Sequence, residues 1–274
     1  MSNNYQVLAL KWRPKHFTDV VGQSHITDTL QKAFEKNRIA QAFLFSGPRG
    51  VGKTTTARLL AMSLNGSDKP TTEYDIESEK VKDIISGSSM DVIEIDGASN
   101  RGIDEIRELR ENIQFLPAEG NYKVIIIDEV HMLTTQAFNA LLKTLEEPPL
   151  HVKFILATTE VRKIPVTILS RCQRFDLKRV GVDQICKLLK SISIREKGNI
   201  SDDAIKLISK TSEGSVRDSI SLLDRALISQ LTNNDQEIKE QDIRQMLGLA
   251  DKSKVLNLFK EVLSGREKEA LGYL

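Results

Sequence analysis

The feature that most constrains this chain is segment 47–54, which reads G-P-R-G-V-G-K-T and fits the phosphate-binding pattern G-x-x-x-x-G-K-T. An apolar run at residues 42–46 precedes it and predicts a buried strand, and a helical pattern at residues 55–64 follows it. In this strand–loop–helix order, backbone amides and the helix N-terminus can cradle phosphate oxygens. A chance glycine turn is the alternative, and the order of the three elements disfavours it. The segment predicts a nucleotide-binding protein.

Individual residues of this loop have distinct expected roles. Lys53 can reach the β- and γ-phosphates, and the Thr54 hydroxyl can hold Mg²⁺. The predicted nucleotide-contacting residues of the segment are Gly47, Gly50, Val51, Gly52, Lys53, Thr54 and Thr55.

A second apolar run, residues 123–128, ends in an acid pair, Asp128 and Glu129. In P-loop NTPases the first acid serves Mg²⁺, and the second, here Glu129, could activate water as a general base. Solvated acids at a strand end are the commoner alternative, but the intact loop upstream favours catalysis. His131 completes the string D-E-V-H, which superficially matches a helicase box. Because such helicases need a second sheet domain, we interpret His131 as structural.

Composition limits the class of protein. The 274 residues suggest about two domains, and 40% hydrophobic with 28% charged residues is an ordinary globular balance. A net charge of +1 gives no global attraction to nucleic acid, so any DNA contact requires a local patch. The sequence shows no apolar run of membrane-spanning length, a polar N-terminus and only Cys172 and Cys186. We therefore expect a soluble cytoplasmic protein with no membrane partner.

The pattern of elements changes along the chain. β-branched apolar runs alternate with helical patterns up to residue 180, which predicts a parallel sheet covered on both faces. After residue 181 the periodicity is helical only, and Ser201 is a plausible N-cap. Expected strands are 42–46, 92–96, 123–128, 152–159 and 174–177; expected helices are 23–37, 55–64, 103–115, 136–145, 183–197, 202–211, 216–230 and 239–246.

An arginine after the fourth expected strand is a further candidate. Arg171 lies in the tripeptide Ser-Arg-Cys, in a short polar segment at the edge of the sheet domain. A lone arginine usually lies solvated on a surface. An arginine supplied to a phosphoryl-transfer site stabilises developing charge and is worth roughly 10³–10⁵ in rate.

Several motifs in order resemble those of AAA+ ATPases, and more closely the gamma/tau subunit family of the bacterial DNA polymerase III clamp loader. The resemblance covers nearly the whole chain. The motifs are Arg13-Pro14 with segment 17–23, the phosphate-binding loop, D-E-V-H-M, segment 139–149 (N-A-L-L-K-T-L-E-E-P-P), Ser-Arg-Cys at 170–172 and G-S-V-R-D at 214–218.

The resemblance implies a fold and a division of the chain. Residues 1–180 would form an α/β AAA+ P-loop NTPase domain with a parallel sheet. Residues 181–248 would form a small helical lid. A helical pattern from about residue 251 would begin, within 249–274, the helical collar that holds such subunits in a ring-like pentamer.

The resemblance also implies roles for residues around the nucleotide. Arg13 and Val21 would line the adenine and ribose side. Thr159 would be the polar sensor that touches the γ-phosphate or its water, with Thr158 as a one-residue alternative. Arg217 would reach the γ-phosphate from the helical domain. Arg171 would act in trans on the ATP of a neighbouring subunit.

The implied function is an ATP- and Mg²⁺-dependent motor subunit of a DNA polymerase III holoenzyme. Its partners would be other clamp-loader subunits, the sliding clamp and primed DNA. Candidate DNA contacts, weakened by the lack of basic residues at two positions, are Ser99, Asn100, Arg101 and Lys143.

One departure from the family concerns zinc. The family usually carries cysteines spaced C-x₈-C-x₂-C-x₂-C after the P-loop helix. Those positions hold Gly66, Asp75, Ser78 and Val81 here, so no thiolate remains and we predict no zinc. Segment 77–85 has Val81, Ile84 and Ile85 at helical spacing, and a short packed helix could order the region instead.

Three other functions are weighed against the clamp-loader prediction. A different AAA+ machine, such as a branch-migration motor or protein remodeller, is disfavoured by the Ser-Arg-Cys and Glu-Glu-Pro-Pro segments. A stator-like subunit that hydrolyses nothing would have a degraded loop, whereas Lys53 and Asp128 are intact. The hypothesis of a small-molecule P-loop kinase does not explain the helical second half or Arg217.

Overall fold

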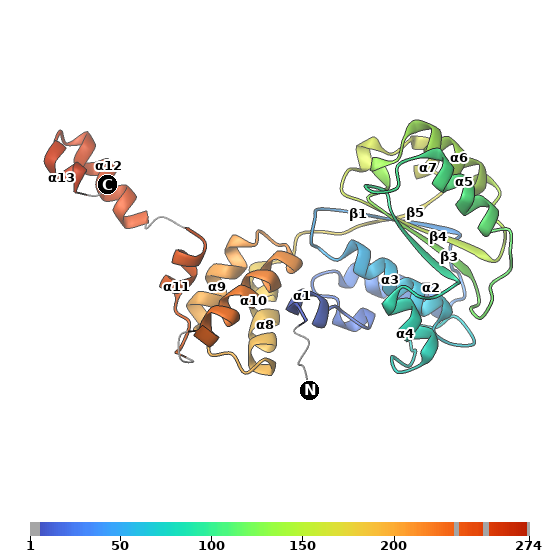
Figure 1. The fold of residues 1–274 in the computed structure, drawn as a ribbon, viewed down its shortest axis with the longest axis horizontal. Coiled ribbons are helices and arrows are strands. Elements are labelled where there is room, and N and C mark those ends of the chain that lie inside the picture. The colour runs from blue at the N-terminus through green and yellow to red at the C-terminus, as the bar shows by residue number, and fades with distance from the viewer. Residues whose placement is uncertain (1–5, 233–235, 249–251, 273–274) are drawn as a thin grey trace.

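The computed structural model describes residues 6–232, 236–248 and 252–272. A sheet domain, a helical domain and a projecting helical pair follow one another (Figure 1). Within the described residues, no helix combines the length and apolar character needed to cross a membrane. The helices are α1 (Leu8–Lys11), α2 (Ser24–Glu35), α3 (Lys53–Asn65), α4 (Glu79–Ser86), α5 (Ile103–Asn112), α6 (Thr135–Glu146), α7 (Val166–Leu169), α8 (Val182–Arg195), α9 (Asp202–Thr211), α10 (Val216–Thr232), α11 (Glu240–Met246), α12 (Lys252–Leu263) and α13 (Glu267–Leu271).

The sheet confirms the expected parallel α/β fold. Its strands are β1 (Ala42–Ser46), β2 (Val92–Asp96), β3 (Lys123–Asp128), β4 (Val152–Thr158) and β5 (Gln173–Asp176), all parallel in the order β2-β3-β4-β1-β5. The first three match the expected ranges. The fourth ends one residue earlier than expected, and the fifth begins and ends one residue earlier. Because all strands run parallel, their carboxyl ends meet at one edge, where a crevice for ligands forms.

Helices cover both faces of the sheet in two layers. Helices α2, α3 and α4 lie on one face and α5, α6 and α7 on the other (Figure 1). Side chains alternate along β1, so Phe43 and Phe45 enter the first core while Leu44 enters the second. Strands buried on both faces explain why the sequence shows continuous apolar runs.

The second half of the described chain is helical, as expected, apart from an isolated bridge between Ile200 and Ile238. Helices α8 to α11 pack around their own core, to which Leu8 of α1 contributes. The Ser201 hydroxyl accepts a hydrogen bond from the Ala204 amide at 3.3 Å, which confirms the predicted N-cap. The short helix α1 was not predicted, because its four residues are held by tertiary packing against the lid.

The segment between α3 and β2 lacks the family's cysteines and is called the cysteine-free segment below. It contains the expected short helix, α4. Ser78 caps its N-terminus, and Gly87 ends it in the left-handed conformation with φ +79°. Val81 and Ile84 are buried against α3, but the predicted packing of Ile85 was wrong, since it is 44% exposed. Tyr74 adds a second anchor, because its hydroxyl donates to the Lys15 carbonyl at 2.7 Å. Apolar packing and caps therefore order this region.

Helix α5 ends earlier than the predicted 103–115. It stops at Asn112, and residues 113–115 continue only as turns before Pro117. The side chains of Phe115 and Leu116 are consequently exposed.

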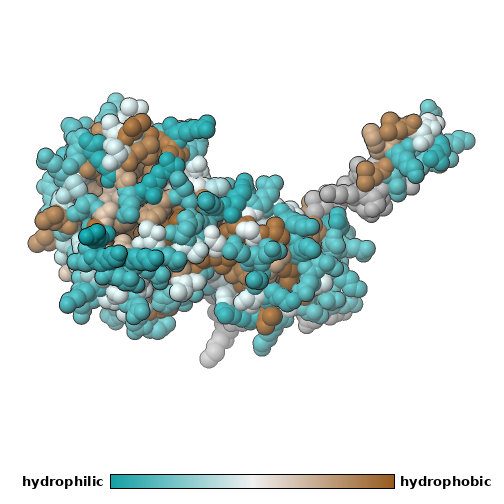
Figure 2. Space-filling model, turned by 180° about the vertical axis from the view of Figure 1, so that it is seen from behind, coloured by the Kyte–Doolittle hydropathy of each residue, from teal (hydrophilic) through white to brown (hydrophobic). Residues whose placement is uncertain are grey.

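Helices α12 and α13 project away from the lid (Figure 1). Figure 2 shows apolar colour on this projecting pair. The exposed apolar side chains of α12 are Leu256, Phe259, Val262 and Leu263.

Candidate nucleotide-binding site

A cavity of about 1020 Å³ opens at the carboxyl edge of the sheet, between the sheet domain and the lid. Its wall combines the N-terminal segment, the phosphate-binding loop, the ends of β2, β3 and β4, and parts of α8 and α10. Most predicted site residues meet there although they are far apart in sequence. These are Arg13, Val21, Gly50, Val51, Gly52, Lys53, Thr54, Thr55, Asp128, Glu129, Thr159 and Arg217.

The phosphate-binding loop uses backbone conformations that favour glycine. Gly50 and Gly52 have φ of +78° and +105°, a region that side chains with a Cβ rarely adopt. Lys53 Nζ donates to the carbonyls of Gly47 and Pro48 at 3.0 and 2.9 Å. Burial lowers the pKa of Lys53, against the opposing effect of Glu129 and Asp128. The lysine is therefore held at the base of the loop, facing the acid pair.

The first acid of the pair, Asp128, lies against the hydroxyl of Thr54 in the phosphate-binding loop. Thr54 Oγ1 donates to Asp128 Oδ2 at 2.6 Å, and Asp128 Oδ1 accepts from the Glu129 amide at 2.9 Å. A hydroxyl and a carboxylate are hard oxygen donors that suit Mg²⁺. Asp96 is in register with Asp128 on the adjacent strand and also lines the cavity. Asp96 was not among the predicted site residues, although it ends an apolar strand just as Asp128 does.

The second acid is held by the end of β4. Thr159 donates to Glu129 Oε2 through its amide at 3.1 Å and its hydroxyl at 3.0 Å. Thr158, the alternative in the sequence analysis, is fully buried, and its hydroxyl lies 3.0 Å from His131 Nδ1. Thr159 therefore faces the cavity and Thr158 packs behind it. His131 also lines the cavity, beside the acid.

The lid side of the cavity carries positive charge. The Arg217 amide donates to the Gly50 carbonyl at 3.1 Å, so the lid is tied directly to the phosphate-binding loop. Burial lowers the pKa of Arg13, as do Arg58 and Arg217 nearby, while Glu94 opposes them. A concentration of guanidinium groups beside a phosphate-binding loop favours a polyanionic ligand.

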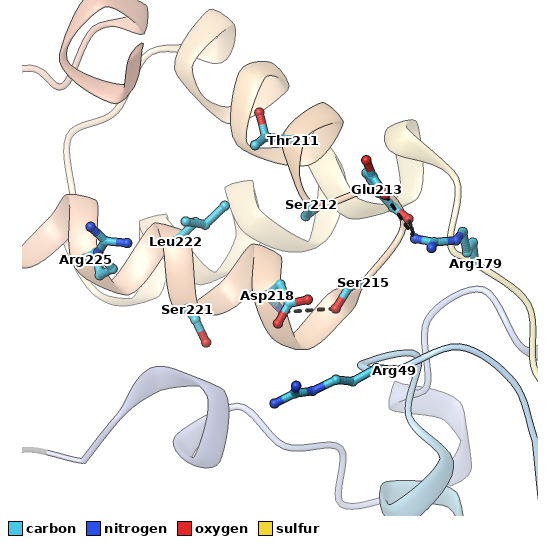
Figure 3. Close-up of a pocket in the computed structure, with 10 residues that line it drawn as sticks. All are labelled: Arg49, Arg179, Thr211, Ser212, Glu213, Ser215, Asp218, Ser221, Leu222 and Arg225. Atoms are coloured by element: carbon cyan, nitrogen blue, oxygen red, sulfur yellow. Dashed lines mark hydrogen bonds and ion pairs between the residues drawn. The ribbon is translucent and has the colours of Figure 1, made fainter. Parts of the chain in front are cut away.

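A smaller polar crevice of about 420 Å³ marks the joint between the loop and the lid. Figure 3 shows Arg49 beneath the turn of α10 that carries Asp218 and Ser221. Arg179 donates to the Glu213 carbonyl, and the Asp218 amide donates to Ser215 Oγ.

Arg49 lines both this crevice and the larger cavity. A Cβ at Gly50 would collide with the Ser215 hydroxyl, so glycine is required for the lid to approach the loop this closely. Arg49 and Ser215 were not among the predicted site residues, although each lies inside a motif that was singled out, segment 47–54 and G-S-V-R-D at 214–218.

The structure does not bring Arg171 to the cavity of its own chain. Its guanidinium pairs with Glu146 Oε1 at 2.9 Å and donates to the Thr167 carbonyl at 2.6 Å. Both charged side chains are partly exposed. An arginine at the surface is available to a neighbouring molecule.

The candidate DNA contacts lie on two elements. Ser99 and Asn100 fold onto Asp96, and Arg101 Nε donates to the Ala98 carbonyl at 2.7 Å, in the loop after β2. Lys143 is exposed on α6, which packs against α5.

Three family models match successive parts of the chain. "DNA polymerase III, delta subunit" matches residues 22–181, and "DNA polymerase III clamp loader subunit, ATPase lid domain" matches residues 184–230. "DNA polymerase III subunits gamma and tau domain III" matches residues 238–274.

Curated relatives cover the same range. The chain is 45% identical over 271 residues to DNA polymerase III subunit tau of Salmonella typhimurium, which spans 99% of the chain and 42% of that relative. It is 51% identical over 224 residues to subunit tau of Bacillus subtilis, spanning 82% of the chain and 40% of the relative. Subunit gamma of Buchnera aphidicola from Acyrthosiphon pisum is 45% identical over 268 residues, spanning 98% of the chain and 73% of the relative. The chain thus covers less than half of these tau relatives.

Solved structures share the fold. The RuvB Holliday junction branch migration motor of Thermotoga maritima superposes with a TM-score of 0.64 at 18% identity, covering 94% of this chain and 81% of that one. At this identity the likeness concerns the fold alone.

Proposed function

This chain belongs to the family of DNA polymerase III gamma/tau subunits, and on that premise we propose that it is an ATP-hydrolysing motor subunit of a clamp loader. Together with other loader subunits it opens a sliding clamp and loads it onto primed DNA. Its site of action is the cytoplasm, within a DNA polymerase III holoenzyme.

One observation carries the proposal. A single cavity joins the phosphate-binding loop, the acid pair, Thr159 and Arg217, while Arg171 lies outside it on the surface. A complete set of phosphate-binding groups that lacks Arg171 of its own chain supports a site completed by the Arg171 of a neighbouring subunit. The intact Lys53 and Glu129 favour hydrolysis over a stator-like role.

ATP binds with its phosphates against the loop amides and Lys53. Arg13 and Val21 contact the adenine and ribose side, and Arg217 contacts the γ-phosphate from the lid. Thr54 and Asp128 would hold Mg²⁺, which would supply positive charge to the phosphates when bound. Since Arg217 is bonded to Gly50 through its backbone, lid position and loop conformation are coupled.

Glu129 acts as general base in the chemical step. Water attacks the γ-phosphorus, its proton passes to the Glu129 carboxylate, and the bond to the β–γ bridging oxygen breaks to give ADP and inorganic phosphate. Thr159 holds the acid and senses the γ-phosphate. Arg171 of the neighbouring subunit stabilises the charge that develops on the transferred group.

Primed DNA contacts the loop after β2 and helix α6 through phosphate oxygens. Arg101 and Lys143 supply the charge, with Ser99 and Asn100 as neutral donors. Binding of this kind is sequence-independent and weakens as salt rises. Replacing both basic residues by alanine should lower DNA-stimulated ATPase and flatten its salt dependence; unchanged stimulation would exclude this patch.

The domain division 1–180, 181–248 and 249–274 is part of the proposal. The family-model boundary between residues 181 and 184 supports the first border. The gamma and tau domain III match begins at residue 238, before the proposed second border.

A subunit-mixing experiment tests the composite site. ATPase is measured for the chain alone, and then for loaders assembled with partner subunits, clamp and primed DNA. Loaders carrying only Lys53→Ala or only Arg171→Ala subunits should both be inactive. Mixed loaders should recover part of the activity, because some sites then combine an intact Lys53 with a neighbour's intact Arg171. Full activity of an isolated monomer, or no recovery on mixing, would contradict the arginine in trans.

A further inference from the structure

His131 occupies a more specific position than a core histidine needs. It lies in the 3₁₀ turn η2 (Val130–Met132), its side chain 5% exposed, directly after the acid pair. Its Nδ1 lies 3.0 Å from Thr158 Oγ1 and 3.3 Å from Glu129 Oε2, and its Nε2 lies 3.4 Å from Glu160 Oε1. The ring therefore bridges the end of β3 and the end of β4.

The turn that brings the ring to the acid is unusual. Glu129 has φ +45° and ψ +45°, a left-handed conformation that few residues other than glycine adopt. This conformation begins the η2 turn, in which the Met132 amide donates to the Glu129 carbonyl at 2.9 Å. Such backbone geometry persists only where the surroundings enforce it, and it commonly marks functional sites.

The contacts on the Glu129 carboxylate are one-sided. The Thr159 amide, the Thr159 hydroxyl and His131 Nδ1 all approach Oε2, at 3.0 to 3.3 Å. None of the described residues forms a hydrogen bond with Oε1. Because a carboxylate only accepts hydrogen bonds, fixing one oxygen leaves the other available to accept a proton from water.

The opposite side of the ring is also anchored. Thr158 Oγ1 accepts the Glu160 amide at 3.0 Å, and Glu160 Oε1 pairs with Lys163 at 2.9 Å. The ring thus rests on a segment held by its own hydrogen bonds. A base must be held in its productive orientation by groups that are themselves fixed.

We infer that His131 is a positioning residue for Glu129: its Nδ1–H, shared between Thr158 Oγ1 at 3.0 Å and Glu129 Oε2 at 3.3 Å, holds Oε2 and so turns Oε1 toward the attacking water. The inference rests on the proposed ATPase function. The competing possibility is that His131 only fills space and bonds to Thr158.

Two amide substitutions separate these possibilities. An asparagine amide nitrogen can stand near the position of Nδ1, facing Glu129 and Thr158. A glutamine amide nitrogen reaches the position of Nε2, facing Glu160. His131→Asn therefore preserves the donor that the inference requires, and His131→Gln removes it while keeping a polar side chain of similar size.

The experiment measures steady-state ATPase of the full-length subunit, assembled with its partner subunits, clamp and primed DNA. His131→Ala and His131→Gln should lower kcat by about tenfold, the scale on which supporting hydrogen bonds act on a reactive group. His131→Asn should retain most of kcat. The KM for ATP and the affinity for a non-hydrolysable ATP analogue should stay unchanged in all three variants, because within the described residues the ring has no hydrogen bond or ion pair to the phosphate-binding loop.

A double-mutant comparison identifies the residue through which His131 acts. Glu129→Gln alone should lower kcat by roughly 10²–10⁴-fold, the range of general-base catalysis. Adding His131→Ala to it should cause no further loss, since the group being positioned is already gone. Additive losses would overturn the inference.

The remaining outcomes also distinguish a positioning role of His131 from a packing role. Equal losses of kcat in the Asn and Gln variants, or a raised KM with a lowered melting temperature, would assign His131 a packing role only. An unchanged kcat in His131→Ala would overturn the inference while leaving the proposed function intact. A wild-type loader without ATPase activity would overturn the proposed function and this inference with it.

Discussion

A lysine and an aspartate lie near each end of strand β3, and the two ends use these charges in opposite ways. At its first residue, Lys123 lies 3.4 Å from Asp91, and both side chains are nearly inaccessible to solvent. Asp91 also accepts the amides of Ala118, Glu119 and Gly120 at 2.7 to 2.8 Å. At its last residue, the Asp128 carboxylate accepts hydrogen bonds from only the Thr54 hydroxyl and the Glu129 amide among the described residues, beside a large cavity.

The difference shows how one sheet separates fold from function. At the amino edge Lys123 and Asp91 neutralise each other, and the turn at residues 117–120 is organised around the Asp91 carboxylate. At the carboxyl edge the charges face open space and keep capacity for a ligand. A charged residue in isolation does not indicate which role it has; the number of its fixed partners does.

The largest expected effects come from replacing one lysine at the carboxyl edge of the sheet and one at its amino edge by alanine. Lys53→Ala should lower kcat/KM for ATP by at least about 100-fold, because the cation that reaches the β- and γ-phosphates is lost. Its melting temperature should change little, since Lys53 bonds only to loop carbonyls among the described residues.

Lys123→Ala is the matched control. The Lys123→Ala substitution should leave the nucleotide affinity of the folded protein unchanged. It should lower the free energy of unfolding by about 3 kcal/mol, because the buried Asp91 carboxylate loses its cationic partner. Both variants are checked by nucleotide titration and urea unfolding. Loss of stability in Lys53→Ala, or loss of affinity in Lys123→Ala, would contradict the separation of the two edges.

The cysteine-free segment belongs to the amino edge and depends on apolar packing. Ile84→Ala should destabilise the protein by about 2–3 kcal/mol, through lost burial and the cavity left behind. Ile85→Ala, next to it, should cost less than about 0.5 kcal/mol, because Ile85 is largely exposed. Chemical unfolding of the pair provides the measurement, and equal losses would show that α4 packs differently.

Asp91→Asn should cost about 2 kcal/mol at pH 7, since three amides and Lys123 lose a charged acceptor. Burial alone would raise the pKa of Asp91, but hydrogen bonds from Glu119, Gly120 and Ala118 outweigh it and lower the pKa. A carboxyl with a lowered pKa stabilises the fold above its unfolded pKa of about 3.9, and this contribution is lost as pH falls toward the folded value.

The stability difference between wild type and Asp91→Asn should therefore narrow as pH falls below about 4. Urea midpoints measured between pH 7 and pH 3 test this. A difference that widens on acidification would show that the Asp91 carboxyl is not held ionised by these partners.

The smallest expected effect concerns metal. A chelator that binds zinc tightly should leave the melting temperature unchanged, because the family's cysteine positions hold Gly66, Asp75, Ser78 and Val81. Metal analysis of the purified chain complements the melt. One stoichiometric zinc per chain, or a melting temperature lowered by the chelator, would contradict the prediction.

Local sequence determined the elements and the identity of the ligand-binding loop. The strands β1, β2 and β3 were predicted to the residue: β1 and β3 are continuous apolar runs buried within the sheet, and β2 is a β-branched run at the sheet edge, interrupted by Glu94. The glycines of segment 47–54 likewise predicted the loop, since the required backbone conformation excludes most other residues. Errors occurred where a neighbour decides the outcome, as at Ile85 and at the end of α5.

Only the tertiary structure decided which polar groups meet. It turned Thr159 toward the cavity and Thr158 toward His131, a difference that one residue of strand alternation produces. It also tied Arg217 to Gly50 and assigned Asp91 and Asp128 to opposite roles. Periodicity and turn chemistry depend on near neighbours in the chain, so a sequence records them directly. The partners of a charge come from distant segments, and they are fixed only when the sheet and the lid have packed.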